Sequence, residues 1–267
     1  MKTIFLTGAS SGIGKAIAIA LAGEGHQVWG TSRDIARLPQ LPNFHPVALD
    51  LADSASSANA FAATIRDAGK IDVLINNAGS GHFGPAENLS AQTTANQFQL
   101  LVFGHIQLMQ LALPVMRSQG NGLIINVTSL ASRLPVPFMA AYNAAKAAMA
   151  VFTMSIQLEL PDSKVRIVDL QPADICTNFN EAVTRPSGQD AIYQRRVAKT
   201  WEAVDRNLRN APKPELVAVQ VCRLINASTP PPRVTVGDFF QSGVAPFIFR
   251  FLPQSLRIWG LKKYYRI

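Results

Sequence analysis

The sequence predicts a single α/β domain built on a doubly wound parallel sheet of about seven strands, with helices on both faces. Short apolar segments of strand-like composition alternate with longer segments of helical periodicity along nearly the whole chain. No internal repeat or low-complexity linker interrupts this alternation. With 267 residues and 48% apolar content, the chain is long enough for one large core and too short for two comfortable domains.

The expected strands are short apolar runs bounded by glycine, proline or polar residues, at residues 3–7, 27–31, 46–49, 72–76, 123–128, 165–170 and 233–237. Helices are expected after Gly12 and over residues 91–118, 141–160, 193–208 and 215–226. We therefore expect one domain over residues 1–267, with a polar, arginine-rich lid at about 178–211 and an apolar, basic tail at about 238–267.

A glycine turn joins the first strand to the first helix. It reads Gly8-Ala9-Ser10-Ser11-Gly12-Ile13-Gly14. Glycines allow a sharp turn and a close approach to a pyrophosphate, and the following helix offers free N–H groups and the positive end of its dipole. The turn therefore predicts binding of nucleotide phosphates through Gly8, Ser10, Ser11, Gly12, Ile13 and Gly14.

The ends of the second and third strands predict which nucleotide binds. A site specific for NAD would place an acidic residue at the end of the second strand, where this chain has Ser32 and Arg33. A guanidinium there suits the 2′-phosphate of NADP(H), although an ordinary surface arginine opening a loop is the alternative. After the third strand come Asp50 and Leu51, expected at the adenine, although Asp50 is equally suited to cap the helix that follows Ser54.

The chemistry is expected in the helix that begins near Ala141. Tyr142 and Lys146 lie four residues apart and therefore on one helix face. At about 4 Å an ammonium contributes about 4 kcal/mol to a phenolate, enough to lower a tyrosine pKa by about three units. Tyr-x-x-x-Lys also occurs on ordinary surface helices, so the interpretation depends on its neighbours. Ser129, at the end of the fifth strand, lies 13 residues before Tyr142 and is placed to face it.

Together these motifs resemble the short-chain dehydrogenase/reductase family over nearly the whole chain. Residues 7–14 are similar to its cofactor turn, Asn76-Asn77-Ala78-Gly79 to its strand-four motif, and Ser129, Tyr142 and Lys146 to its catalytic residues. The segment from Pro172 to Thr177 is similar to the family's Pro-Gly-x-x-x-Thr loop, with alanine for glycine.

The resemblance implies a Rossmann-like fold that binds NADP(H) and transfers a hydride between nicotinamide and a carbonyl or secondary alcohol. It implies cofactor contacts from Asn77, Ala78, Gly79, Tyr142, Lys146, Pro172, Ile175 and Thr177. One departure is Leu101, which stands where the family usually has an asparagine in a proton relay to the lysine. We expect main-chain carbonyls to hold the relay water instead.

The apolar loops and tail favour a hydrophobic substrate of the steroid, retinoid or long-chain type. Two other functions remain open: reduction of a 3-oxoacyl chain on a carrier protein, where the basic surface would meet an acidic carrier, and non-catalytic NADP(H) sensing. The tail's many aromatic and aliphatic residues must be partly covered, by the lid, by a second subunit or by a membrane. We expect a homo-oligomer, either a dimer or a tetramer.

Composition excludes several other classes. The net charge of +8 is spread along the chain without a nucleic-acid-binding signature, so no nucleic-acid partner is expected. Cys176 and Cys222 are too few and too widely spaced for a disulfide framework, and the amino terminus does not resemble a signal peptide. We therefore expect a cytoplasmic protein. His26, His45, His82 and His105 lack ligand-like spacing, so no metal site is expected.

Overall fold

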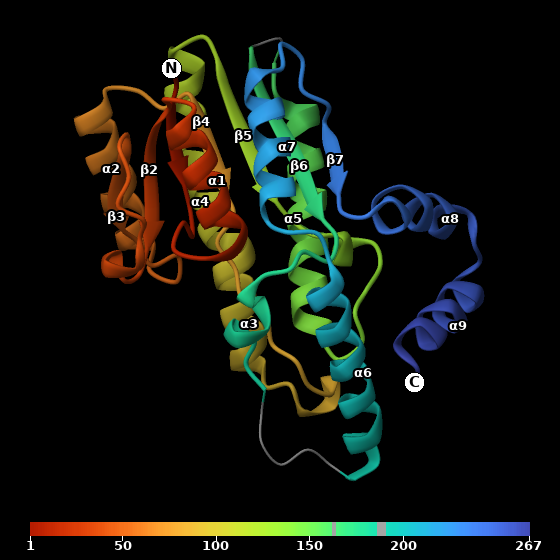
Figure 1. The fold of residues 1–267 in the computed structure, drawn as a ribbon. Coiled ribbons are helices and arrows are strands. Elements are labelled where there is room, and N and C mark those ends of the chain that lie inside the picture. The colour runs from red at the N-terminus through yellow and green to blue at the C-terminus, as the bar shows by residue number, and fades with distance from the viewer. Residues whose placement is uncertain (162–163, 186–190) are drawn as a thin grey trace.

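The structure, a computed structural model, describes residues 1–161, 164–185 and 191–267. Its centre is one parallel sheet of seven strands in the order β3-β2-β1-β4-β5-β6-β7 (Figure 1). The strands are β1 (Thr3–Leu6), β2 (Gln27–Ser32), β3 (Phe44–Ala48), β4 (Val73–Asn76), β5 (Gly122–Val127), β6 (Val165–Pro172) and β7 (Arg233–Val236). The predicted doubly wound fold is confirmed, with its strand order reversing between β1 and β4.

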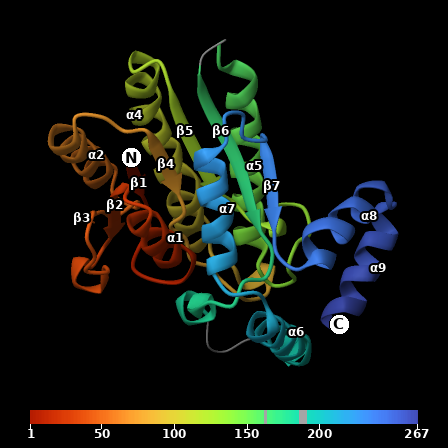
Figure 2. The same ribbon diagram turned by 45° about the horizontal axis from the view of Figure 1, so that its top comes forward.

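Helices cover both faces of the sheet. They are α1 (Gly12–Gly23), α2 (Ser54–Ala68), α3 (Ala91–Phe98), α4 (Gly104–Ser118), α5 (Ala140–Glu159), α6 (Ala191–Asn210), α7 (Glu215–Asn226), α8 (Ala245–Phe251) and α9 (Gln254–Tyr265). Helices α1 and α7 lie together on one face, and α2, α4 and α5 lie on the other (Figure 2).

Alternation along the strands divides the core between these two faces. In β1, Ile4 and Leu6 pack in the cluster with α1 and α7, whereas Phe5 packs in the cluster with α2 and α4. The five inner strands are buried on both faces, which explains why they read as continuous apolar runs, whereas the edge strands β3 and β7 are partly exposed. Pro46 is accommodated because β3 is an edge strand that pairs only with β2.

The predicted long helix over residues 91–118 is a continuous helical segment with one irregular turn. A π-helical turn, η3 (Gln99–Phe103), separates α3 from α4. By length and composition alone the segment is apolar enough to cross a membrane, but Leu108, Met109, Ala112 and Met116 are buried against the sheet. It is therefore a core helix, and its π turn lies beside α5.

Asp50 and Asp53, which precede α2, have different roles in the structure. The side chain of Asp53 accepts from Ala55 N at 2.9 Å and caps α2, which ends at Gly69 in the left-handed conformation. Asp50 instead accepts from Ala52 N at 3.0 Å inside the preceding turn. The alternative of Asp50 as the cap of α2 is therefore wrong, and its place at the end of β3 stays compatible with the adenine.

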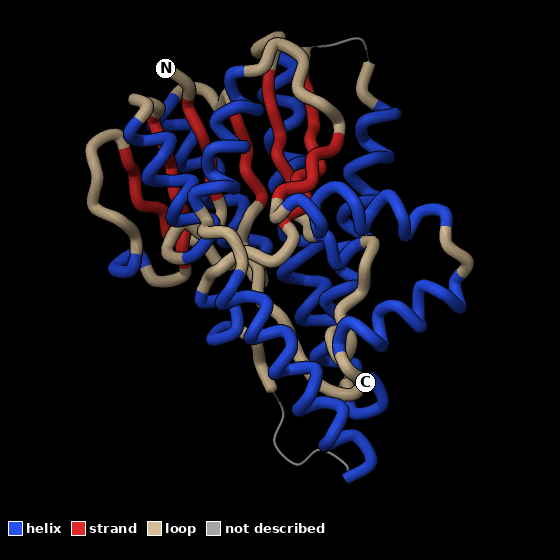
Figure 3. Tube along the Cα trace, turned by 45° about the vertical axis from the view of Figure 1, so that its right-hand side comes forward, coloured by secondary structure: helices blue, strands red, loops and turns tan. Residues whose placement is uncertain are grey.

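The last part of the chain departs from the compact sheet. Helix α6 extends past the carboxyl ends of the strands, and α8 and α9 project beyond β7, with the C-terminus returning to α6 (Figures 1 and 3). The lid helix is longer than the predicted 193–208, and residues 186–190 of the predicted lid lie outside the described residues. The tail packs on the body through the buried Tyr265 and through Tyr264, whose hydroxyl accepts from Asn207 Nδ2 at 2.9 Å.

Candidate functional site

Four of the predicted site residues follow the carboxyl ends of neighbouring strands, and Tyr142 and Lys146 lie in helix α5. Gly8 follows β1, Asn77 follows β4, Ser129 follows β5 and Thr177 lies beyond β6. In an open parallel sheet this edge is where ligands bind, next to the point where strand order reverses. The fold thus brings together residues that are up to 169 positions apart in the chain.

The glycine turn has the geometry of a dinucleotide cradle. Gly8 and Gly12 have φ values of 71° and 52°, which favour glycine. A Cβ on Gly14 would lie 2.0 Å from the carbonyl oxygen of Gly8, so the helix and turn pack too closely for any side chain. Ser11 begins α1 without a capping side-chain bond, which leaves its hydroxyl and the first N–H groups of the helix available to phosphates.

The same turn contacts the other loops of the predicted cofactor site. A Cβ on Gly12 would lie 3.4 Å from the side chain of Thr177, and one on Gly8 would lie 2.8 Å from Ala78 Cα. Asn77 donates from Nδ2 to the carbonyl of Thr7 at 2.9 Å, which ties β4 to the turn. The side chain of Asn77 therefore holds the backbone of the glycine turn in place. The sequence motif predicted a contact to the cofactor but not this structural role.

The ends of β2 and β3 provide the residues expected at the adenosine end. Arg33 is exposed and makes no ion pair within the described residues, while Ser32 Oγ accepts from Asp34 N at 3.2 Å. The nearby carboxylate of Asp34 accepts from Ala36 N at 3.0 Å and does not pair with Arg33. Leu51 is buried and packs closely against Gly104.

Ser129 and Tyr142 come together as predicted. The Ser129 hydroxyl lies close enough to the phenol to favour its ionised form. Ser129 Oγ also accepts from Ala131 N at 3.0 Å, which fixes the serine at the start of a short 3-10 turn. A carbonyl oxygen placed against both hydroxyls would receive two hydrogen bonds, the arrangement needed to polarise it and to protonate it.

Lys146 is held differently from the sequence prediction. Its Nζ donates to the carbonyl of Val127 at 2.8 Å and lies 5.9 Å from the centroid of the Tyr142 ring. No hydrogen bond joins the ammonium to the phenol hydroxyl within the described residues, and the expected fall in the pKa of Tyr142 does not occur. Burial instead raises this pKa to about 12, the Ser129 hydroxyl opposes the rise, and the charge of Asp174 adds to it.

Burial also changes the lysine. It lowers the pKa of Lys146 to about 8, although the carboxylate of Asp169 favours the charged form. A lysine with this pKa gains and loses its proton near neutral pH. It can therefore both stabilise a phenolate and pass a proton on.

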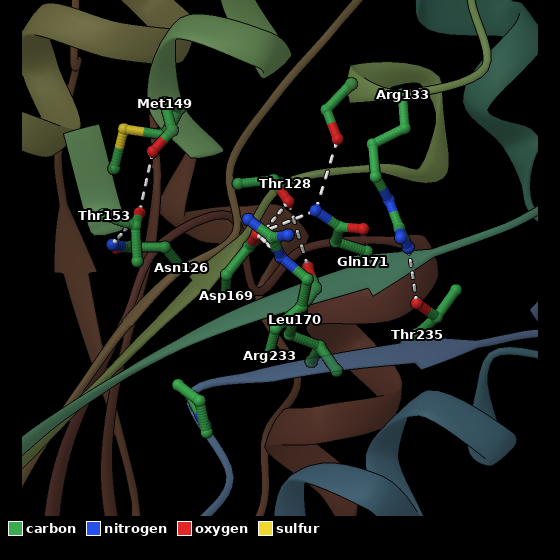
Figure 4. A network of polar contacts seen from close by, with 12 residues as sticks. Asn126, Thr128, Arg133, Met149, Thr153, Asp169, Leu170, Gln171, Arg233 and Thr235 are labelled. Carbon is green, nitrogen blue, oxygen red and sulfur yellow. Dashed lines mark hydrogen bonds and ion pairs between the residues drawn. The ribbon is translucent and has the colours of Figure 1, made fainter. Parts of the chain in front are cut away.

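A buried polar network holds the strand ends beneath Ser129 (Figure 4). The carboxylate of Asp169 accepts from Thr128 Oγ1, from Gln171 Nε2 at 2.7 Å and from Arg233 Nε at 2.8 Å. Thr128 immediately precedes Ser129, so the network joins β5, β6 and β7 at the catalytic loop. It fixes the backbone from which the serine projects.

Leu101 and His105 occupy the region beside the lysine. Leu101 is fully buried in the π turn and packs in one cluster with Ala145 and Tyr142. A Cβ on Gly79 would lie 3.0 Å from Leu101 Cδ2 and 3.9 Å from Lys146 Nζ. The imidazole of His105 hydrogen-bonds the carbonyl of Leu101, and burial lowers the pKa of His105 to about 3. The carbonyl expected to hold a relay water thus already has one partner.

The loop after β6 carries three predicted cofactor residues and one that the sequence reasoning did not assign. Pro172 ends β6, Ile175 is buried, and Thr177 Oγ1 accepts from Phe179 N at 3.3 Å. Between them lies Asp174, which is half-buried and accepts from Gln241 Nε2 at 2.6 Å. The sequence feature that could have drawn attention to Asp174 is a single carboxylate in an otherwise mostly apolar loop.

Apolar side chains surround the other side of Tyr142. Phe83, Met139, Val183 and Val197 form a buried cluster, and the rings of Tyr142 and Phe179 lie 5.7 Å apart. The cluster joins the loop before α3, the loop before α5 and the lid helix α6. A cavity of about 590 Å³ opens beside it, with an apolar part lined by Phe83, Val197, Ala198 and Trp201 and a polar part lined by Arg185, Gln194, Glu202 and Asp205. The buried cluster therefore suits an apolar group, and the cavity is polar on one side.

Comparisons with known proteins give consistent relatives. A family model described as short chain dehydrogenase matches residues 2–187. The chain is 30% identical to the 3-ketodihydrosphingosine reductase of Bacteroides thetaiotaomicron, across 100% of this chain and 98% of that protein. A short-chain dehydrogenase from Streptomyces avermitilis is 25% identical with a TM-score of 0.81, covering 99% of this chain and 96% of the other. A metagenomic short-chain oxidoreductase in complex with NADP is 27% identical with a TM-score of 0.71, covering 88% of this chain and 96% of the other.

Proposed function

The chain belongs to the short-chain dehydrogenase family, and from that premise we propose that it is an NADP(H)-dependent reductase of long-chain ketones. The observation that carries the proposal is the end-to-end similarity to a 3-ketodihydrosphingosine reductase, which extends through the lid and the tail. The lid helix α6 contributes Val197 to the apolar cluster beside Tyr142, and the tail helix α9 contacts α6. The similarity favours the long-chain type over the steroid and retinoid types.

The apolar cluster beside Tyr142 supports a substrate with a hydrocarbon chain. Its buried members Phe83, Met139, Val183 and Val197 offer no charge and no unsatisfied donor to a ligand. Each methylene group that enters such surroundings contributes about 0.8 kcal/mol. A long chain can therefore supply most of the binding free energy, leaving the polar groups to orient the ketone.

In the proposed reaction a ketone, a hydride and a proton become a secondary alcohol. Bound NADPH supplies the hydride. Ser129 donates a hydrogen bond to the carbonyl oxygen, and Tyr142 transfers its proton to that oxygen as negative charge develops there. A phenol with a pKa of about 12 is protonated at neutral pH, which suits the reductive direction. Lys146 then stabilises the phenolate and helps to restore its proton.

The choice of NADP(H) over NAD(H) rests on Ser32 and Arg33. The exposed guanidinium of Arg33 is free of acidic partners within the described residues and stands at the end of β2. A charge-assisted contact to a 2′-phosphate is worth about 1.5 to 3 kcal/mol. Asp34 does not oppose this contact strongly, because its carboxylate is engaged by Ala36 N.

The direct experiment follows NADPH oxidation with 3-ketodihydrosphingosine in detergent micelles and, separately, with a 3-oxoacyl chain on its carrier protein. The proposal predicts turnover of the free lipid and little or none of the carrier-linked chain. The reverse preference would make the carrier-linked function correct. Tight NADPH binding without turnover of either substrate would support the alternative of a non-catalytic NADP(H) sensor.

That the protein is a cytoplasmic homo-oligomer remains a prediction. The two free cysteines suit a reducing compartment.

A further inference from the structure

Asp174 is a carboxylate placed at the reacting end of the substrate side. It follows β6 by two residues, in the loop that also carries Ile175 and Thr177. Its negative charge acts on Tyr142, the residue that is to deliver the proton. The negative charge of this carboxylate destabilises the Tyr142 phenolate that forms during the reaction. A positive charge bound beside Asp174 would remove this effect.

Asp174 has no cationic partner in the described part of the chain. Within the described residues no lysine, arginine or histidine forms an ion pair with it. Gln241 Nε2 donates to Oδ2, whereas no hydrogen bond reaches Oδ1 within the same part of the chain. The chain is rich in cations, with a net charge of +8, and other carboxylates such as Asp169 do pair with arginine.

The position of this carboxylate is maintained by the tail. Gln241 contacts Asp174 twice, because its Oε1 also accepts from Asp174 N at 3.2 Å. The same Gln241 donates from Nε2 to Tyr264 of α9 at 3.2 Å. The carboxylate is therefore oriented by its neighbours but not neutralised by them, and burial raises its pKa.

From this arrangement, and resting on the proposed function, we infer that Asp174 binds an ammonium group on the carbon next to the ketone, which makes the enzyme selective for long-chain α-amino ketones. The carbonyl oxygen must contact Ser129 and Tyr142, and Asp174 stands in the loop after β6, the strand beside β5, close enough for its charge to act on Tyr142. An ammonium there satisfies the free carboxylate oxygen. It also cancels the charge that disfavours the Tyr142 phenolate, so recognition and proton transfer are linked.

The test compares three ketones of the same chain length with wild type and Asp174→Asn: the amino ketone 3-ketodihydrosphingosine, its N-acetyl derivative and the ketone without nitrogen. The N-acetyl derivative keeps the nitrogen and removes its charge. Wild type is expected to prefer the amino ketone in kcat/KM by about 10- to 150-fold, the range of one charge-assisted hydrogen bond. In D174N this ratio of kcat/KM values should fall close to one, mainly because KM for the amino ketone rises.

Asp238→Asn is the matched control. Asp238 is a nearby carboxylate that accepts from Gln241 N at 2.8 Å and whose charge Asp174 senses. D238N should keep the wild-type preference, and Asp174→Glu should restore part of what D174N loses. Equal loss of preference in D238N and D174N would overturn the inference, because a general negative field would then explain the preference.

Two further outcomes separate this inference from the proposed function. Wild type that reduces all three ketones equally would overturn the role of Asp174 and leave long-chain ketone reduction intact. Wild type that reduces none of them, while oxidising NADPH with a carrier-linked substrate, would overturn both. The wild-type comparison needs no variant, so the inference can be rejected even if D174N does not fold.

Discussion

The glycine turn is tightly packed, whereas the C-terminal tail is loosely packed and largely exposed. At Gly14 an added Cβ would lie 2.0 Å from the backbone of Gly8, whereas at Gly260 of α9 an added Cβ would meet nothing within 4 Å. Strand β1 is buried throughout, but the tail exposes a run of large apolar side chains: Phe239, Phe240, Phe247, Ile248, Phe251, Leu256, Ile258, Trp259 and Tyr264. The cofactor end is thus fixed by packing, and the substrate end retains freedom to fit an apolar ligand.

The largest expected effect falls where the two regions meet. Tyr142→Phe removes the hydroxyl that transfers the proton but leaves the ring packed against Phe179. Turnover should fall by about 100- to 10,000-fold. The dissociation constant for NADPH, measured by fluorescence titration, should change little, because the cradle is untouched. Ordinary turnover in this variant would contradict the catalytic assignment.

Arg33→Ala should affect the cofactor region alone. Loss of the contact to the 2′-phosphate is expected to weaken NADPH binding by about 10- to 150-fold while leaving NADH binding nearly unchanged. Measured dissociation constants for both cofactors decide the point. An unchanged preference would mean that Arg33 is an ordinary surface arginine.

Two glycine substitutions compare the regions directly. Gly14→Ala forces the turn and α1 apart, so the free energy of unfolding should fall by about 1 to 3 kcal/mol and NADPH binding should weaken. Gly260→Ala should raise the free energy of unfolding by up to about 1 kcal/mol, because alanine is the better helix former and the added methyl group meets open space. Urea unfolding of both variants tests the difference. Equal destabilisation would mean that the tail is packed as tightly as the turn.

The pH dependence of the reaction should follow Lys146, which lies between the two regions. Burial lowers its pKa from the ordinary lysine value to about 8, so in the free enzyme the side chain is charged below pH 8 and neutral above it. For reduction, kcat/KM should therefore decline above about pH 8, by at most about tenfold per pH unit. Lys146→Arg, which stays charged, should show lower activity without this decline. A decline at the same pH in both proteins would assign it to another group.

The smallest effect is expected from the substrate region alone. Deleting the residues after Pro253 removes Tyr264, which bonds both Gln241 and Asn207. KM for long-chain ketones should rise a few-fold, with little change for small ketones or for NADPH. If the truncated protein folds and treats both sizes alike, the tail has no part in the pocket. Sedimentation with liposomes would then test whether its exposed aromatic and basic residues bind a membrane.

The contrast also explains what could be predicted from the sequence. The strands, the glycine turn and the Ser129–Tyr142 pair follow from periodicity and spacing, because packing allows few alternatives there. The pKa of Tyr142 was not predictable, since it depends on burial and on Asp174, not on the spacing to Lys146. Nor was the contact between His105 and the carbonyl of Leu101, which lies in the π turn.

The central claim is that an apolar chain is bound on the substrate side of an NADPH-dependent active site. The most direct measurement is kcat/KM with NADPH for a series of ketones that differ only in chain length. The account predicts a rise of up to about fourfold for each added methylene, from about 0.8 kcal/mol per buried group, until the apolar surface is filled. A value that stays constant from short to long chains would contradict it.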